Sequence, residues 1–532
     1  MTCVGIGETR ELLQSGQSSV TDHVQSVMTT IREVDSGLGA FVSVAGDAAL
    51  RDAEAADLRI RERGRAAWQD KPLLGITISV KDLIQTRDLP TTRGSLLANC
   101  RARVDAPAVA RLRAAGAIVV GKTTTSEHGW SAGTVSRVAP PTHNPWHRGR
   151  SAGGSSGGAA AAVAAGLCTA ALGTDGAGSI RIPAAFCGVV GYKPSAGRVP
   201  YVPACPQRLS HLGPIARSVP DVAELTVLLA GAHPEDPDSG IRLPDSVREP
   251  SPLRIGWIEF PRTSGEVREV TERVWPVLAE RGHRVERIDV PFPDPYPALV
   301  DILAAGEAAG TGEEDEPWCD RGRLEIVHYG RTVSGAAVML AAEVRLALRI
   351  RLRAVMATYD LLAMATVPVE PFDAHAIAPP WAARPSDLLW LAWSPASYPF
   401  NMTGQPAISL PLGLTSSGLP VGLQLVGSCG ADNLVLAVAN RIEAEIGSLP
   451  VALGPAVNLN ERVKWPLVWL ARQVPRAGCR AAVPTARRPG GGPGQSWLWR
   501  DVAVRPVGTG GTRAMGRRGI PAGISLNSGC SQ

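Results

Sequence analysis

Two kinds of hydrophobic pattern alternate along the first half of the chain. Short continuous apolar runs are typical of buried strands, and the run "LLGITISVKDLI" predicts a strand that ends at Lys81. Apolar residues at helical spacing in "DAPAVARLRAAG" predict a helix that stops at Gly116, and the β-branched run after it predicts another strand. This alternation continues to about residue 230. The pattern predicts an α/β fold with buried strands.

The same patterns divide the chain up to residue 448. The hydrophobic pattern of residues 18–64 predicts one or two helices around "GLGAFVSV". "LRIGWIEF" and "HRVERIDVPF" predict two strands that flank the helix "GEVREVTERVWPVLAERG". A long helical region is expected over residues 298–357, followed by short strands from Tyr359 to Gly427. A closing amphipathic helix is expected to end at Gly447.

Residues 449–532 differ in kind from the rest. Segments such as "ARRPGGGPGQ" are rich in Arg, Gly and Pro without sustained periodicity, which predicts disorder. From Val451 onward the sequence contains 12 lysines and arginines but only two acidic residues, Glu461 and Asp501. The net charge of this part is therefore about +10, and that of the preceding part about −5. We therefore expect a globular domain over residues 1–448 and a basic extension over 449–532. A dispensable addition, a translated frameshift and an RNA- or anion-binding tail stay open for that extension.

Cysteines and charges limit the location and the partners. Nine cysteines, an odd number without a C-x-x-C pair, favour free thiols of a cytoplasmic protein over a disulfide framework or a zinc site. Glu8, Arg10 and Glu11 stand where a signal peptide needs an apolar core. The uncharged stretch Ser151–Thr174 consists mainly of Gly, Ala and Ser, so it predicts a buried loop and helix and no membrane span. The mildly acidic body gives no reason to expect nucleic acid, except through the basic tail.

The stretch "GAIVVGKT", Gly116–Thr123, matches the phosphate-loop pattern letter for letter. A phosphate loop needs a strand before the glycine-rich turn and a helix that starts at the lysine. Here a helix comes first, and the variable positions Ala-Ile-Val-Val favour a strand over an anion-binding loop. We expect a buried strand that ends in a polar turn and binds no nucleotide.

The candidate chemistry lies in the glycine-rich stretch Ser151–Pro194. In "TDGAGS" the backbone N–H groups of Gly176, Ala177, Gly178 and Ser179 can turn toward one site, where Ser179 also places its hydroxyl. A nucleophile beside its own oxyanion donors is what acyl transfer requires. This pattern makes Ser179 a candidate nucleophile.

A serine hydroxyl needs a base to take its proton, and the glycine-rich stretch contains no histidine. Lys81, at the end of its predicted strand, is the better candidate. A lysine in a dry pocket loses its preference for the charged form and can act as a base near neutral pH. A second serine from the "GGSSGG" loop can relay the proton between Lys81 and Ser179.

Several of these segments together resemble the amidase signature family of Ser-cisSer-Lys hydrolases. The resemblance is densest over residues 72–200 and implies the amidase signature fold, a mixed central β-sheet covered by helices on both sides. It implies an amidase that hydrolyses the C–N bond of a small carboxamide to carboxylate and ammonia or amine, without metal or cofactor. A homodimer is left open, and no membrane association is expected. The segments are "GITISVKD", "TTRGS", "GAIVVGKTTTSE", "NPW", "GGSSGGAAAAVAAG", "GTDGAGSIRIPAAFCGVVGYKPSAGRV" and "FNMTGQPAISLPLGLTSSGLPVGLQLVG".

The resemblance also implies roles for individual residues. Ser179 corresponds to the nucleophile of an acyl-enzyme, Ser155 to the bridging serine and Lys81 to the general base. The peptide bond from Gly154 into Ser155 is expected to be cis. The backbone of residues 176–179 corresponds to the oxyanion hole. Supporting roles are expected for Ser156 and Asp175 in the loop, and for Arg181 as a structural ion-pair partner.

Structural alternatives stay open for these residues. Gly153–Gly157 also fits the G-x-S-x-G elbow of α/β-hydrolases, but the elbow needs a strand directly before it, where "PTHNPWHRGRSA" has proline and charge. For Ser179 the alternative is a helix cap, and for Lys81 a surface lysine that closes a strand. His128 and Trp130 are expected either to line the substrate pocket or to serve packing.

Two departures from the family pattern stand out. Ala177 replaces the usual glycine, and a positive φ at this position would cost about 1–2 kcal/mol. "LLAMATVPVEPF" replaces the commoner Leu-Thr-Pro-Thr segment. Specificity is expected in the variable segments 128–147, 296–330 and 370–398, where "PWAARP" and "LLWLAW" hint at an aromatic or aliphatic acyl group.

Two other functions are compatible with the resemblance. One is the glutaminase subunit of a tRNA-dependent amidotransferase, although "PSDLLWLAWSPASYP" does not resemble the counterpart segment of that subunit. The other is a catalytically silent family member, which the intact set of Lys81, Ser155 and Ser179 disfavours.

Overall fold

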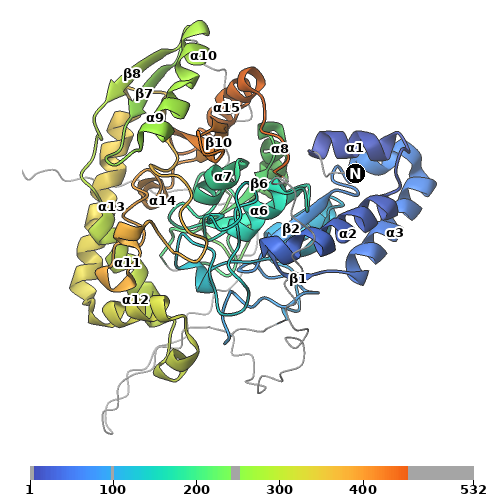
Figure 1. The fold of residues 1–532 in the computed structure, drawn as a ribbon, viewed down its shortest axis with the longest axis horizontal. Coiled ribbons are helices and arrows are strands. Elements are labelled where there is room, and N and C mark those ends of the chain that lie inside the picture. The colour runs from blue at the N-terminus through green and yellow to red at the C-terminus, as the bar shows by residue number, and fades with distance from the viewer. Residues whose placement is uncertain (1–4, 98–100, 206, 241–251, 453–532) are drawn as a thin grey trace, which may run out of the picture. The chain divides into compact units, whose positions relative to one another are not determined.

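One mixed β-sheet organises the chain in this computed structural model, which describes residues 5–97, 101–205, 207–240 and 252–452 (Figure 1). The order across the sheet is β1-β3-β2-β4-β6-β5-β10-β11-β9-β7-β8. This sheet confirms the predicted α/β class. The predictions for the basic extension fall almost entirely outside the described residues. The strands are β1 (Phe41–Val44), β2 (Thr77–Lys81), β3 (Ile118–Thr123), β4 (Ala170–Asp175), β5 (Val190–Lys193), β6 (His211–Ala216), β7 (Arg254–Ile258), β8 (Arg284–Ile288), β9 (Leu361–Ala365), β10 (Ala407–Leu414) and β11 (Pro420–Gly427).

Parallel pairing in one half of the sheet positions the candidate chemistry. β2 pairs in parallel with both β3 and β4. The carboxyl ends of parallel strands meet at the same edge of a sheet. Lys81 at the end of β2 and Asp175 at the end of β4 therefore reach the same edge.

Helices cover both faces of the sheet. A Cβ at Gly191 in β5 would lie 2.6 Å from Cβ of Ala184 in α7, so glycine lets this helix approach the strand closely. The next residue, Tyr192, donates a hydrogen bond to Asp432 in α15. Because successive side chains of a strand point to opposite faces, α7 and α15 lie on different sides. The helices are α1 (Ile6–Gln14), α2 (Val20–Leu38), α3 (Asp47–Arg63), α4 (Ala67–Asp70), α5 (Pro107–Ala114), α6 (Gly157–Ala164), α7 (Arg181–Cys187), α8 (Val219–Leu229), α9 (Gly265–Glu272), α10 (Val274–Glu280), α11 (Tyr296–Ala309), α12 (Arg321–Thr332), α13 (Gly335–Val355), α14 (Pro399–Thr403) and α15 (Asp432–Ile446).

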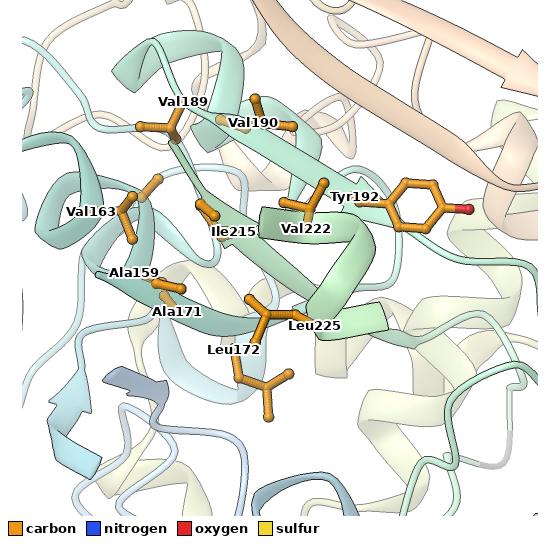
Figure 2. Close-up of a cluster of buried hydrophobic side chains, with 14 of the residues drawn as sticks. Ala159, Val163, Ala171, Leu172, Val189, Val190, Tyr192, Ile215, Val222 and Leu225 are labelled. Atoms are coloured by element: carbon orange, nitrogen blue, oxygen red, sulfur yellow. The ribbon is translucent and has the colours of Figure 1, made fainter. Parts of the chain in front are cut away.

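The core beside the site consists of apolar side chains from the sheet and from two helices. Figure 2 shows Ala159 and Val163 of α6 and Val222 and Leu225 of α8 together with residues of β4, β5 and β6. Every residue of the stretch Ser151–Thr174 is buried, as its small uncharged side chains predict. In the part of the chain that the structure describes, no helix has the length and apolarity needed to cross a bilayer.

The structure differs from the predicted elements in three places. "FVSV" forms strand β1, which pairs antiparallel with β3 at the edge of the sheet. The helix predicted before β8 is divided into α9 and α10 at Arg273, because Pro276 cannot donate to the carbonyl four residues earlier. The long helical region over residues 298–357 is divided into α11, a short helical turn at Glu313–Trp318, α12 and α13.

Candidate active site

Lys81 lies fully buried at the end of β2. Its Nζ lies 2.7 Å from Oγ of Ser155 and 2.8 Å from Oγ1 of Thr174. Burial lowers the pKa of Lys81 well below that of a free lysine, and the nearby Asp175 carboxylate offsets only part of this effect. The surface-lysine alternative is therefore wrong. The geometry gives a buried amine with a lowered pKa that touches a serine hydroxyl.

Ser155 lies in the glycine-rich loop that leads into α6. The Gly154–Ser155 peptide bond is cis, as the resemblance implies. Gly129 packs directly on this serine. A Cβ at position 129 would lie only 3.0 Å from Oγ of Ser155, so glycine makes room for the hydroxyl. The neighbouring Ser156 donates to the carbonyl of Thr174 at 3.1 Å, which ties the loop to β4. Ser155 is thus held between Lys81 and the cavity.

Ser179 lies in the turn between β4 and α7 and is partly exposed in the wall of a cavity of about 160 Å³. Ser155 and Thr174 line the same cavity. The carbonyl of Ser179 accepts a hydrogen bond from the backbone N–H of Ser156 at 3.1 Å, which joins the two loops. The fold therefore brings Lys81, Ser155 and Ser179 together, although 98 residue numbers separate the first from the last.

Asp175 and Arg181 fix the shape of the turn around Ser179. The two residues form a fully buried ion pair, with Nε of Arg181 2.9 Å from Oδ2 of Asp175. Burial alone would raise the pKa of Asp175, but the guanidinium of Arg181 holds it below its usual range. Asp175 also accepts from the backbone N–H groups of Gly178 and Ile180. These are the supporting roles expected for Asp175 and Arg181.

The backbone donors differ from the prediction at one position. The N–H of Gly178 donates to Oδ1 of Asp175 at 2.7 Å, so it is not available to an oxyanion. Among the described residues, the N–H groups of Gly176, Ala177 and Ser179 donate no hydrogen bond. The positive φ of this turn, 118°, falls on Gly178, so Ala177 escapes the expected strain. Three donors are left for an oxyanion, in place of four.

His128 and Trp130 both lie in the cavity wall. His128 adopts a positive φ of 52°, and burial, with smaller contributions from Arg323 and Arg93, lowers its pKa to about 3. The carbonyl of Trp130 accepts from Nε1 of Trp390 at 2.8 Å. All three segments expected to carry specificity contribute to the wall. A further group that sequence reasoning did not include also contributes, namely Tyr201, Cys205, Gln207, Leu209 and Ser210.

The two motif alternatives find no support in the geometry. Lys122 of "GAIVVGKT" is fully buried in β3, with Nζ 3.1 Å from Oδ1 of Asp82 and 2.7 Å from Oγ1 of Thr91. This lysine is buried inside the sheet and paired with a carboxylate of the protein, whereas the lysine of a phosphate loop reaches the phosphates of a nucleotide. The described residues between β3 and Ser155 form no strand, although a nucleophile elbow would need one directly before the serine.

Thr174 and the partners of Arg181 are the functional neighbours that sequence reasoning missed. Thr174 directly precedes Asp175 in the quoted motif, so its position gave a usable signal. Arg181 donates to Oδ1 of Asn401 at 2.6 Å and to Oε1 of Gln424 at 2.7 Å. Both amides lie in the quoted segment that begins with "FNMTG" and thus belong to the resemblance. Within the described ranges, no group of three metal-ligating side chains comes together.

Comparisons with known proteins agree with this geometry. A profile described as Amidase matches residues 22–436. An acylamidase from Rhodococcus erythropolis is 34% identical over 450 residues, covering 81% of this chain and 93% of the relative. One subunit of a glutamyl-tRNA(Gln) amidotransferase from Thermus thermophilus is 36% identical over 474 residues, covering 82% of this chain and 96% of the relative. The structure of 6-aminohexanoate cyclic dimer hydrolase with its substrate superposes with a TM-score of 0.75 at 29% identity, covering 85% of this chain and 99% of that one.

Proposed function

The chain belongs to the amidase signature family and is a hydrolase acting on amides, and we propose that it works through an acyl-enzyme on Ser179. The observation that carries the proposal is the contact of 2.7 Å between the buried amine of Lys81 and the hydroxyl of Ser155. A neutral amine in this position can accept a proton, and Ser155 can pass on the proton of Ser179. Lys81, Ser155 and Ser179 are therefore proposed as the catalytic residues.

In the proposed mechanism, Oγ of Ser179 attacks the amide carbonyl while its proton moves to Ser155 and the proton of Ser155 moves to Lys81. The carbonyl oxygen becomes an oxyanion, which the N–H groups of Gly176, Ala177 and Ser179 stabilise. Return of the proton through the relay to the amide nitrogen expels ammonia or an amine and leaves the acyl-enzyme. Water then attacks the ester, loses its proton to the same relay, and releases the carboxylic acid and free Ser179.

The glutaminase subunit of an amidotransferase is the second candidate, because such a protein is among the similar ones. Free glutamine carries an α-carboxylate, which sites in proteins commonly bind with an arginine or lysine. No arginine or lysine lies among the described residues that line the cavity. We therefore favour a small amide without a carboxylate as the substrate.

The proposed cellular location rests on the described cysteines alone. The described cysteines Cys168, Cys187, Cys205, Cys319 and Cys429 are free, which fits a reducing compartment such as the cytoplasm. The homodimer stays a prediction, as does any role of the basic extension in binding an anion.

Release of ammonia from a panel of amides tests the proposed activity. The panel contains aliphatic amides, aryl amides and glutamine, and the full chain is assayed beside a chain stopped at residue 448. We expect release from simple amides by both proteins. Release from glutamine alone would favour the glutaminase of an amidotransferase, and no release from any amide would favour a catalytically silent protein.

The rate should depend on pH through Lys81. The mechanism needs its neutral form, so kcat/KM should rise with pH and level off once Lys81 is deprotonated. Because burial lowers the pKa of Lys81, we expect the midpoint well below the 10.5 of a free lysine. The measurement is kcat/KM for one simple amide across the pH range, with circular dichroism at each pH as a control for unfolding. A midpoint near 10.5 would show that Lys81 is not the base, and the rising limb should be absent in Lys81→Met.

A further inference from the structure

The cavity wall contains one carboxylate among its described residues, that of Glu307. Glu307 and Leu303 come from α11, and Ile326 comes from α12. Figure 1 shows these two helices beside α13, on the side of the molecule opposite to α1, α2 and α3. The side chain of Glu307 is 20% exposed. An acid therefore faces the space that also contains Ser179.

Arg323 of α12 holds one oxygen of this carboxylate. Nε of Arg323 lies 2.7 Å from Oε2 of Glu307. The other nitrogens of Arg323 bond to Oγ1 of Thr311 at 2.7 Å and to Sγ of Cys319 at 3.3 Å. Arg323 is almost fully buried and has a partner at each nitrogen, so it cannot turn toward a substrate. In the described part of the chain, no hydrogen bond reaches Oε1 of Glu307.

The charges around Glu307 do not cancel. Glu127 lies 3.8 Å from Arg323 across a second, weaker ion pair. Its oxygens accept from Oγ of Ser95 and from the backbone N–H of Asp320, each at 2.6 Å. His128 adds no positive charge, because burial lowers its pKa to about 3. Two carboxylates thus share one guanidinium, and one of them, Glu307, faces the cavity. Burial raises the pKa of Glu307, and the guanidinium of Arg323 offsets part of this effect.

We propose that Glu307 binds the positively charged end of the substrate, and that the preferred substrates are amides carrying a primary ammonium group. This inference rests on the proposed function, because it names the substrate class for the same cavity. An ammonium group would donate a charge-assisted hydrogen bond to the free oxygen of Glu307. It would also compensate the excess negative charge in a wall that otherwise contains apolar and uncharged polar groups.

The test uses three series of straight-chain amides of increasing length that end in ammonium, methyl or carboxylate. At the length that spans Ser179 and Glu307, we expect kcat/KM for the ammonium amide to exceed that of the methyl amide by about tenfold or more. The carboxylate amide should be the slowest of the three. In Glu307→Gln the ratio of ammonium to methyl amide should fall about tenfold, mainly through KM. Glu325→Gln, an exposed carboxylate on the same helix as Arg323, should leave the ratio as it is in the natural protein.

Two results would overturn the inference while leaving the amidase in place. One is hydrolysis of all three series with no preference for ammonium. The other is a preference that Glu307→Gln does not reduce. Calorimetric titration of the ammonium and methyl amides into Ser179→Ala needs no turnover and separates this inference from the catalytic proposal. Tighter binding of the ammonium amide there would support Glu307 even if no amide were hydrolysed, and equal binding would refute it.

Discussion

Replacing Ser179 with alanine is expected to lower kcat for amide hydrolysis by about 10⁴-fold or more, because no acyl-enzyme can form without its hydroxyl. The fold should persist, since the side chain of Ser179 makes no hydrogen bond among the described residues. The measurement is steady-state ammonia release from a simple amide, with thermal unfolding recorded in parallel.

Ser210→Ala is the matched control, because Ser210 supplies another hydroxyl to the same cavity wall. Its loss of kcat should be far smaller than that of Ser179→Ala. If Ser179→Ala kept about a hundredth or more of the activity, Ser179 would not be the nucleophile. Ser155 would then be the next residue to replace, since its hydroxyl lies directly against Lys81.

Replacing Arg181 with methionine is expected to lower the free energy of unfolding by about 3–5 kcal/mol at neutral pH. The substitution leaves the carboxylate of Asp175 buried without its counter-charge. It also removes the donors that Ser397, Asn401 and Gln424 now bind. The measurement is denaturant-induced unfolding of the full chain. Arg384→Met is the control, because this 81%-exposed side chain pairs with Asp387 at the surface and should cost less than about 1 kcal/mol.

The sign of the pH dependence adds a second test of the same substitution. In the natural protein the pKa of Asp175 lies below its usual range, so its contribution to stability is present above the unfolded pKa of 3.8 and is lost as the pH falls through the folded pKa. Without Arg181, burial raises the pKa of Asp175, so its carboxyl becomes protonated and neutral at a higher pH. The loss of unfolding free energy caused by Arg181→Met should therefore become smaller as the pH falls toward the acid range. If Arg181→Met lowered the free energy of unfolding no more than Arg384→Met does, the buried carboxylate of Asp175 would not need Arg181 as its counter-charge.

Local sequence signals predicted most elements of the fold. The end of β2 at Lys81, the stop at Gly116 and the end of α15 before Gly447 follow from hydrophobic runs and glycine caps. β1 was not predicted, because its four residues gain their partners only from β3. The division at Arg273 follows from Pro276, a signal that was present in the sequence but not used.

The polar centre of the site could be predicted from the sequence, whereas its walls could not. Lys81, Ser155 and Ser179 lie in dense motifs whose glycine content restricts what the backbone can do. Glu307 lies in a helical segment without a motif, and only the packing of α11 and α12 places it in the cavity. Position in a cavity depends on contacts between segments that are distant in sequence, and periodicity carries no information about such contacts.

The place of β5 in the sheet has a consequence for the nascent chain. β5 pairs with β6 on one side and with β10 on the other, and Lys193 at its end donates to the carbonyl of Gln405, 212 residues further along. During synthesis the segments that carry Lys81, Ser155 and Ser179 are complete long before β10 leaves the ribosome, and until then β5 is an open edge that can pair with other chains. Premature termination before β10 should therefore yield aggregates, and not merely an inactive enzyme. The last tenth of the globular part thus keeps the chain soluble, while the first half supplies the proposed catalytic groups.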